Sequence, residues 1–300
     1  MWIEPTTLTV PVDGGQLRVA RWGSGANVVL ASHGITANHR SFGEVASQLL
    51  DRGTDVTLYA VDHRGRGGSV SLPGPYGLAA HARDLVAVLD HLDVGSATLL
   101  GHSMGAFIVA VAAELAPSRV ERLVVVDGAL PIPVELPDDA DVEAVVRSVI
   151  GPALDRLDRT FASPDECVAM WQEHSAVGGR YFNDVTDAYV RYDLTTDGSI
   201  WRPNVSKAAV LDDGESTLVD TEARTALERI HAPTVLLWAP RGLLDEPPGL
   251  FSTEQVDEVV ARLPHVRAAQ VTDANHYSIV FGPHGAAQVA DAVESEPLAT

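Results

Sequence analysis

Residues 101–105 read Gly-His-Ser-Met-Gly and follow an apolar run at residues 97–100. A serine hydroxyl becomes a strong nucleophile when a base removes its proton, and G-x-S-x-G is typical of a serine held on a sharp strand-to-helix turn. Side chains larger than glycine at the two flanking positions would collide with neighbouring backbone there. We predict that Ser103 is the nucleophile of an acyl-transfer reaction. The alternative is an ordinary strand-to-helix turn that happens to contain a serine.

A base for this serine must come from one of eleven histidines, and position selects among them. His276 lies in "QVTDANHYSIVFG", between the last strand-like run and the last helical pattern. In the chain order that accompanies this type of turn, serine comes first, then an acid, then histidine on such a loop. We predict that His276 is the base. The alternative is a histidine packed in the core.

Two aspartates compete to orient the imidazole and stabilise its charged form. Asp127 ends the strand-like run "RLVVVD", and Asp245 follows the next such run in "LLWAPRGLLDEPPG". Asp127 could instead have a structural role, in which its carboxylate caps a turn by accepting from neighbouring amides. Asp245 lies on a long loop, which is poorly suited to the tight turn that would aim its carboxylate at the histidine. Asp273, close to His276 in the sequence, is a third candidate. The acid therefore stays open at this stage.

The segment "ASHGIT" at residues 31–36 ends an early strand-like run. Acyl transfer builds negative charge on an oxygen, which requires hydrogen-bond donors that are fixed in advance. The amides of Ile35 and of Met104, the residue after the serine, are the predicted donors. Gly34 would let the backbone approach a substrate closely. The alternative is a simple strand-ending turn.

No other pattern indicates a cofactor or a metal. The segment "DHRGRGGS" at residues 62–69 lacks the lysine and the spacing of a phosphate-binding loop, so we interpret it as a structural turn. The spacings typical of zinc and calcium sites do not occur in the sequence. The lone Cys167 lies in a helix-like stretch without a glycine turn, which favours a packed thiol.

Composition limits the partners. With 21 basic and 41 acidic residues the net charge is −20, which argues against nucleic acid and anionic membranes, because phosphate binding needs clustered cations. No apolar stretch approaches the about 18 residues of a membrane span, and the start "MWIEPTTLTV" does not resemble a secretory signal. We expect a cytoplasmic protein with a small-molecule substrate. The sequence carries no signal for an oligomeric state.

Alternating patterns indicate the elements that position these residues. A hairpin is predicted over residues 8–23, around Asp13-Gly14-Gly15. Strand-like runs follow at residues 27–34, 56–65, 97–103, 120–128, 232–240 and 266–276. Helical spacing occurs at residues 40–53, 77–92, 104–117, 253–263 and 284–294. Apolar strands joined by helices predict an α/β fold with a mostly parallel, doubly wound sheet.

The alternation stops for about a hundred residues, which predicts an inserted helical cap. We expect a first core part at residues 1–128, the cap at 129–229 and a second core part at 230–300. The cap is rich in aromatic residues, which would roof an apolar pocket or pack within the cap itself. The cap aromatics are Trp171, Tyr181, Phe182, Tyr189, Tyr192 and Trp201. Of these, Trp171, Tyr181 and Tyr189 are the predicted substrate contacts.

Taken in order, "ASHGIT", "DHRGRGGS", "GHSMG" and the histidine in "DANHYS" resemble the α/β-hydrolase superfamily over nearly the whole chain outside the predicted cap. The resemblance implies Ser103 as nucleophile and His276 as base. The usual family acid would be Asp245. Some branches, including haloalkane dehalogenases and zearalenone lactonases, carry the acid one strand earlier, at Asp127. Dehalogenases and epoxide hydrolases use aspartate as the nucleophile, so a serine favours ester-type chemistry.

The resemblance implies an acyl-enzyme mechanism. We expect hydrolysis of a carboxylic ester or lactone with a small to medium apolar substrate, without a cofactor. Two other functions fit the same motifs: cleavage of a carbon–carbon bond or acyl transfer to an acceptor other than water, and a ligand receptor that retains the triad but turns over poorly.

Overall fold

Eight strands form one mixed sheet in the computed structural model, which describes residues 2–132 and 141–295. β1 (Thr6–Val12) and β2 (Gly15–Gly23) form the predicted hairpin, and β2 also pairs antiparallel with β4 (Val56–Val61). The other neighbours are parallel, in the order β1-β2-β4-β3-β5-β6-β9-β10. The remaining strands are β3 (Asn27–Ser32), β5 (Ala97–His102), β6 (Val120–Val126), β9 (Thr234–Trp238) and β10 (Val266–Gln270). The predicted fold class is confirmed.

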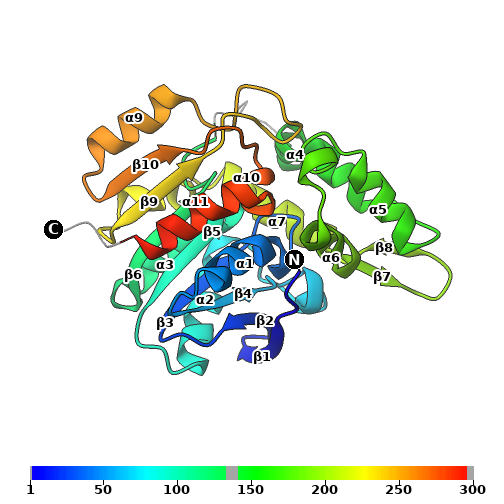
Figure 1. Ribbon diagram of the computed structural model, residues 1–300, viewed down its shortest axis with the longest axis horizontal. Helices are drawn as coiled ribbons and strands as arrows, with labels where there is room; N and C mark the ends of the chain where they lie inside the picture. Colours follow the sequence, from blue (N-terminus) through cyan, green and yellow to red (C-terminus); the bar gives the residue numbers. More distant parts are fainter. Residues whose placement is uncertain (1, 133–140, 296–300) are drawn as a thin grey trace.

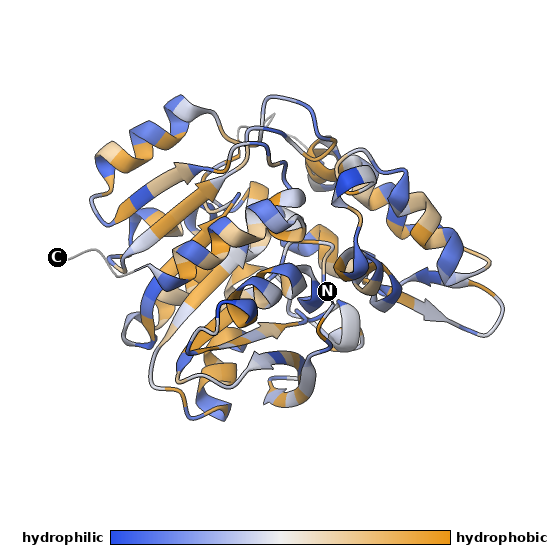
Figure 2. Cartoon of the chain, in the orientation of Figure 1, coloured by the Kyte–Doolittle hydropathy of each residue, from blue (hydrophilic) through white to orange (hydrophobic). Residues whose placement is uncertain are grey.

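Helices cover both faces of the sheet, as apolar parallel strands require. α2 (Leu78–His91), α3 (Met104–Leu115) and α9 (Thr253–Arg262) pack into one apolar cluster, and α1 (Gly43–Asp51) and α11 (Pro283–Glu294) into the other. The central strands are hydrophobic along much of their length, whereas the outer helices alternate between hydrophobic and hydrophilic residues (Figure 2). Every residue of β5 is buried.

Between β6 and β9 the chain leaves the sheet and forms five helices and a small hairpin within its described residues (Figure 1). We call the described residues 128–132 and 141–233 the β6–β9 insertion. The helices are α4 (Val142–Leu157), α5 (Pro164–Gln172), α6 (Asp184–Tyr192), α7 (Lys207–Leu218) and α8 (Thr221–Arg224). The hairpin consists of β7 (Leu194–Thr196) and β8 (Trp201–Pro203). That this insertion acts as a separate cap remains our proposal, and residues 133–140 of the predicted cap lie outside the described residues.

Short helices complete the chain. α10 (Ser278–Phe281) precedes α11, and single 3₁₀ turns occur at His39–Phe42, Gly67–Ser69, Pro117–Arg119, Gly179–Tyr181 and Ala226–Glu228. The last predicted strand is five residues long rather than eleven, because the chain turns after Gln270 and reaches a positive φ of 58° at Asp273. Over the described residues, no helix is both long and apolar enough to cross a membrane.

Strand register brings the candidate residues to one edge of the sheet. Ser32 at the end of β3 is level with Gly101 of β5, His102 is level with Val126 of β6, and Val126 is level with Leu237 of β9. Because these four strands are parallel, their carboxyl ends meet at the same edge. The loops that leave this edge therefore form one site.

Candidate active site

Ser103 occupies a strained turn between β5 and α3. Its φ of 56° and ψ of −124° lie where residues other than glycine are rare. The turn is tight enough that a Cβ added at Gly105 would lie 1.9 Å from the Ser32 carbonyl oxygen, and one at Gly101 would lie 2.3 Å from the Gly105 oxygen. The two glycines of the motif thus let the backbone pack closely on both sides of the serine in the sequence.

A chain of hydrogen bonds links Ser103, His276 and Asp127. His276 Nε2 lies 3.1 Å from Ser103 Oγ, and its Nδ1 lies 2.7 Å from Asp127 Oδ2. Asp127 is fully buried, and its second oxygen accepts a hydrogen bond of 3.0 Å from the Ala239 amide. A carboxylate accepts from Nδ1–H, which leaves the lone pair of Nε2 facing the serine hydroxyl. This geometry suits removal of the serine proton.

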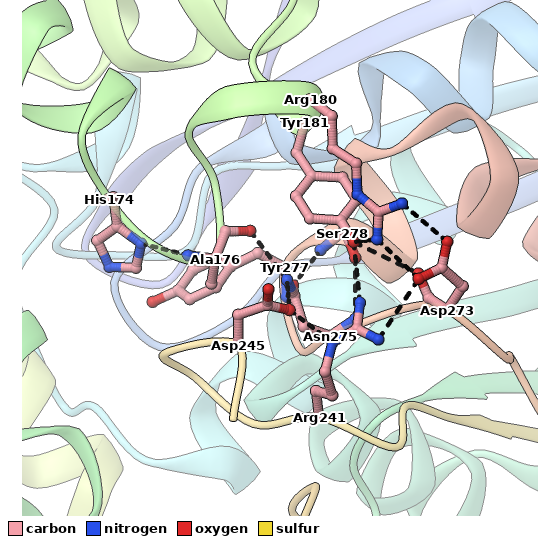
Figure 3. A network of polar contacts seen from close by, with 10 residues as sticks. All are labelled: His174, Ala176, Arg180, Tyr181, Arg241, Asp245, Asp273, Asn275, Tyr277 and Ser278. Atoms are coloured by element: carbon pink, nitrogen blue, oxygen red, sulfur yellow. Dashed lines mark hydrogen bonds and ion pairs between the residues drawn. The ribbon is translucent and has the colours of Figure 1, made fainter. Parts of the chain in front are cut away.

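Asp245, the second candidate acid, faces a different partner (Figure 3). Its Oδ1 accepts from Arg241 Nε at 2.6 Å and from Asn275 Nδ2 at 2.8 Å. The Arg241 carbonyl oxygen in turn accepts from the His276 amide at 3.1 Å. Asp245 therefore supports the loop that carries His276 rather than its imidazole. Asp273, the third candidate, pairs with Arg180 at 2.7 Å.

Ile35 and Met104, the two predicted oxyanion donors, line one cavity together with Ser103. A Cβ on Gly34 would be 3.2 Å from Ser103 Cβ, so the loop before Ile35 passes close to the serine. Met104 is the first residue of α3, and an amide at this position has no acceptor within its own helix. Both positions suit amides that stabilise an oxyanion, and this role remains our proposal.

Arg66 fixes the loop of Ile35, which the sequence did not indicate. Its Nε and Nη2 donate to the Ile35 carbonyl oxygen at 3.0 and 2.8 Å, and its Nη1 lies 2.5 Å from Asp213 Oδ2 in α7 of the insertion. Arg66 is fully buried. The neighbouring Arg64, by contrast, makes a bidentate pair with Asp84. The glycine-rich segment at residues 62–69 contains both arginines and could have drawn attention to them. The sequence does not show that Arg66 faces the site, because this depends on the tertiary structure.

His102 also supports His276. Its Nε2 lies 2.8 Å from the His276 carbonyl oxygen, an acceptor, so this nitrogen carries the proton. Burial and the nearby His276 hold the pKa of His102 well below its ordinary value, so the ring is neutral. Because His102 directly precedes Ser103, one strand end positions both the nucleophile and the loop of the base.

Buried neutral histidines give the fold a pH dependence. Burial lowers the pKa of His33 to about 3 and holds the pKa values of His63 and His102 well below their ordinary value. His33 Nε2 accepts from the His63 amide at 3.1 Å, so its Nδ1 donates to the Gly34 carbonyl oxygen at 2.7 Å. Protonation of His33 would break the first of these bonds.

We expect the free energy of unfolding to fall as the pH is lowered from 6.5 to 5. In this window the unfolded chain binds a proton at each of these histidines and the folded chain does not, which costs about 2 kcal/mol for His33 alone. Asp193 acts in the opposite direction, because burial raises its pKa to about 6 and the folded protein gains a proton there. Its contribution is about 1 kcal/mol. Urea unfolding at the two pH values measures the difference, and equal or greater stability at pH 5 would contradict it.

Three cavities lie around the serine. One of about 40 Å³ is lined mainly by apolar side chains, among them Met104 and Phe107, and reaches Ser103. A second of about 50 Å³ is lined by Ser103, His276 and Tyr189. A third of about 540 Å³ is lined by Trp171 and adjoins the second, with which it shares four lining residues. The site therefore offers a small apolar pocket that reaches the serine and a large space that adjoins it.

Tyr181, the third predicted substrate contact, does not line any of these three cavities. Its hydroxyl lies 2.9 Å from Arg241 Nη2 and 2.6 Å from Arg180 Nη2, so it belongs to the network of Figure 3. Cys167 is buried, and burial raises its pKa to about 12, which disfavours a thiolate. Among residues 2–132 and 141–295, no cluster of histidine, cysteine or acidic side chains could hold a metal ion.

A mostly parallel sheet with a serine on the turn after a central strand defines the class of α/β-hydrolase enzymes. A family model described as alpha/beta hydrolase fold matches residues 27–283. The chain is 28% identical to N-formylmaleamate deformylase of Pseudomonas putida, over 89% of this chain and 88% of that protein. It is 30% identical to 3-hydroxybutyrate-oligomer hydrolase of Cupriavidus necator, over 87% of each chain.

Among solved structures, E-2-(acetamidomethylene)succinate hydrolase superimposes with a TM-score of 0.74 at 22% identity, covering 97% of this chain and 99% of that one. This likeness shows a shared fold. Together with the family model, the comparisons show that the chain belongs to the alpha/beta hydrolase fold family and is an enzyme of that family.

Proposed function

We propose that the protein is a serine hydrolase that cleaves a carboxylic ester through an acyl-enzyme, with Ser103 as nucleophile, His276 as base and Asp127 as acid. The observation that carries this proposal is the continuous hydrogen-bond chain from Asp127 Oδ2 through His276 to Ser103 Oγ. A ligand receptor that retains the triad would share this geometry, so turnover is the property that distinguishes the two functions.

In the proposed reaction, His276 Nε2 takes the proton of Ser103 while Oγ attacks the ester carbonyl. The amides of Ile35 and Met104 stabilise the oxyanion that forms. As the intermediate collapses, His276 returns the proton to the leaving alcohol and an acyl-serine remains. Water, deprotonated by His276, then attacks the acyl group and releases the acid and the free serine.

The small apolar cavity beside Ser103 supports a short acyl group, because its volume is about 40 Å³. The large cavity supports a bulkier remainder of the substrate. A second candidate reaction is hydrolysis of an N-acyl bond. It is favoured by the similarity to N-formylmaleamate deformylase, which extends over 89% of the chain. Both reactions use the same residues and differ in the leaving atom.

A series of p-nitrophenyl esters from acetyl to octanoyl tests the proposal. We expect an initial burst of p-nitrophenol close to the enzyme concentration, because the good p-nitrophenolate leaving group makes acylation faster than hydrolysis of the acyl-enzyme. We also expect kcat/KM for acetyl and butyryl esters to exceed that for the octanoyl ester by about 10-fold or more, since a pocket responds to added methylenes. Turnover no faster than that of a variant lacking Ser103 would contradict the proposal.

A further inference from the structure

Arg156 of α4 is buried inside the β6–β9 insertion, yet it is weakly paired. Its relative exposure is 8%, and its guanidinium lies 4.9 Å from the Trp171 ring. Nη1 contacts Asp193 Oδ2 at 3.3 Å, and Nη2 contacts Thr36 Oγ1 at 3.2 Å. A guanidinium has five N–H donors, so these two long contacts leave most of its hydrogen-bonding capacity unused.

Two other buried arginines show what full pairing looks like in this protein. Arg64 holds Asp84 with two contacts of 2.7 Å and also donates to two backbone carbonyls. Arg66 makes two bonds to the Ile35 carbonyl and lies 2.5 Å from Asp213. Because a buried charge is costly unless it is well paired, the loose pairing of Arg156 suggests that it has a further anionic partner.

The large cavity of about 540 Å³ gives this partner room. Arg156 and Arg159 line it, and Glu246 is the one acidic residue among the described residues that line it. His174 also lines the cavity, and burial and the nearby Arg156 lower its pKa, so it adds no charge at neutral pH. Although the protein has a net charge of −20, the described residues that line this cavity include two arginines and one acid. Its charge favours an anion.

This cavity adjoins the cavity at the serine. Ile150, Ala153, Leu243 and Tyr277 line both the large cavity and the cavity that contains Ser103 and His276. Arg156 is also hydrogen-bonded to Thr36, the residue after the predicted oxyanion donor Ile35. A substrate that extends from Ser103 into the large cavity therefore passes close to the guanidinium.

We propose that the large cavity binds a carboxylate on Arg156, so that the substrate is an ester or N-acyl compound with a free carboxylate on its leaving part. Two parallel N–H···O bonds from an arginine match the geometry of a carboxylate. The short acyl group then occupies the small apolar cavity. This inference rests on the proposed function, since it identifies the substrate class of the same site.

Two probes of equal shape test the inference: 4-acetoxybutanoate, which carries a carboxylate, and 4-acetoxybutanamide, which is neutral. Acetate release gives kcat/KM for each. We expect the wild-type protein to prefer the anionic probe at least 10-fold. Arg156→Gln and Arg156→Lys should each lower this preference at least 10-fold. The lysine variant keeps a positive charge facing Asp193, but it loses the planar guanidinium that donates two parallel hydrogen bonds to a carboxylate.

Arg147→Gln is the matched control. Arg147 lies on the same helix, is exposed and pairs with Glu143 and Asp155 away from the cavity. This variant removes the same charge and should keep the preference of the wild-type protein. Thermal unfolding of each variant shows whether it is folded. If the glutamine variant does not fold, the lysine variant alone decides.

The outcomes separate the two proposals. If both probes are cleaved in a Ser103-dependent way without preference for the anionic one, the carboxylate site is overturned and the proposed function stands. The same holds if the Arg156 variants keep the preference of the wild-type protein. If neither probe is cleaved, the p-nitrophenyl esters decide the proposed function, and calorimetric binding of glutarate decides the carboxylate site. If glutarate binds at least 10-fold more tightly than glutaramide and Arg156→Lys weakens its binding, the carboxylate site is supported. Equal binding of the two compounds overturns the carboxylate site.

Discussion

Replacement of Ser103 by alanine should lower kcat for ester hydrolysis by about 10⁵-fold, because loss of the nucleophile removes the acyl-enzyme pathway altogether. The side chain of Ser103 makes its hydrogen bond to His276, and alanine deletes only the hydroxyl. The backbone φ of 56° is as unfavourable for alanine as for serine, so little change in stability is expected. Steady-state kinetics and thermal unfolding of the variant measure the two effects.

A covalent label makes this experiment specific. A fluorophosphonate should modify the wild-type protein at Ser103 and leave the Ser103→Ala variant unmodified, as judged by peptide mass spectrometry. Ser199→Ala is the control, because Ser199 is exposed on the turn of the β7–β8 hairpin. It should be labelled and active like the wild type. Full activity of Ser103→Ala would rule out the proposed nucleophile.

The fold could be predicted from the sequence because its signals are local. Apolar strands such as β5 alternate with helical spacing such as that of α3, and this pattern defines the sheet and its helical layers. The predicted turn at Asp13-Gly14-Gly15 joins β1 to β2. The hairpin of β7 and β8 was not predicted, because each strand has three residues and no periodicity can be read over that length.

The site could be predicted only where one motif contains the whole signal. The turn around Ser103 is such a motif, since the two glycines and the serine are adjacent in sequence. Arg66 and Arg156 are different: each faces its partner across a long sequence separation, Ile35 in one case and Asp193 in the other. The first contact depends on how the loops after β3 and β4 lie side by side, and the second on how α4 and the end of α6 pack within the β6–β9 insertion. No local pattern encodes either arrangement.

The choice of acid shows the same limit. Asp127 and Asp245 both follow a strand that ends at the edge carrying His276, so sequence position favoured Asp127 only slightly and left both acids open. Strand order places the end of β6 next to that of β5, and thus Asp127 lies close to Ser103. The longer excursion before Asp245 instead allows its carboxylate to reach Arg241 and Asn275.

Comparison of Asp127→Asn with Asp245→Asn tests this assignment. We expect Asp127→Asn to lower kcat by about 10⁴-fold. An asparagine amide oriented toward His276 would donate to Nδ1, so that the proton moves to Nε2 and the ring no longer accepts the serine proton. The amide oxygen can still accept from the Ala239 amide, and asparagine tolerates the positive φ of 47° at this position. The variant should therefore stay folded.

Asp245→Asn is the matched control, because it makes the same chemical change in the loop that follows the next strand, β9. Its oxygen can still accept from Asn275 and Arg241, although the ion pair with Arg241 is lost. Since the carboxylate of Asp245 is partly exposed, we expect a loss of less than about 10-fold in kcat and of about 1 kcal/mol or less in stability. The opposite order of effects, with Asp245→Asn the slower enzyme at equal stability, would transfer the acid to Asp245. It would also mean that the carboxylate exchanges Arg241 for His276 when substrate is bound, because its present contacts hold only the loop of the base.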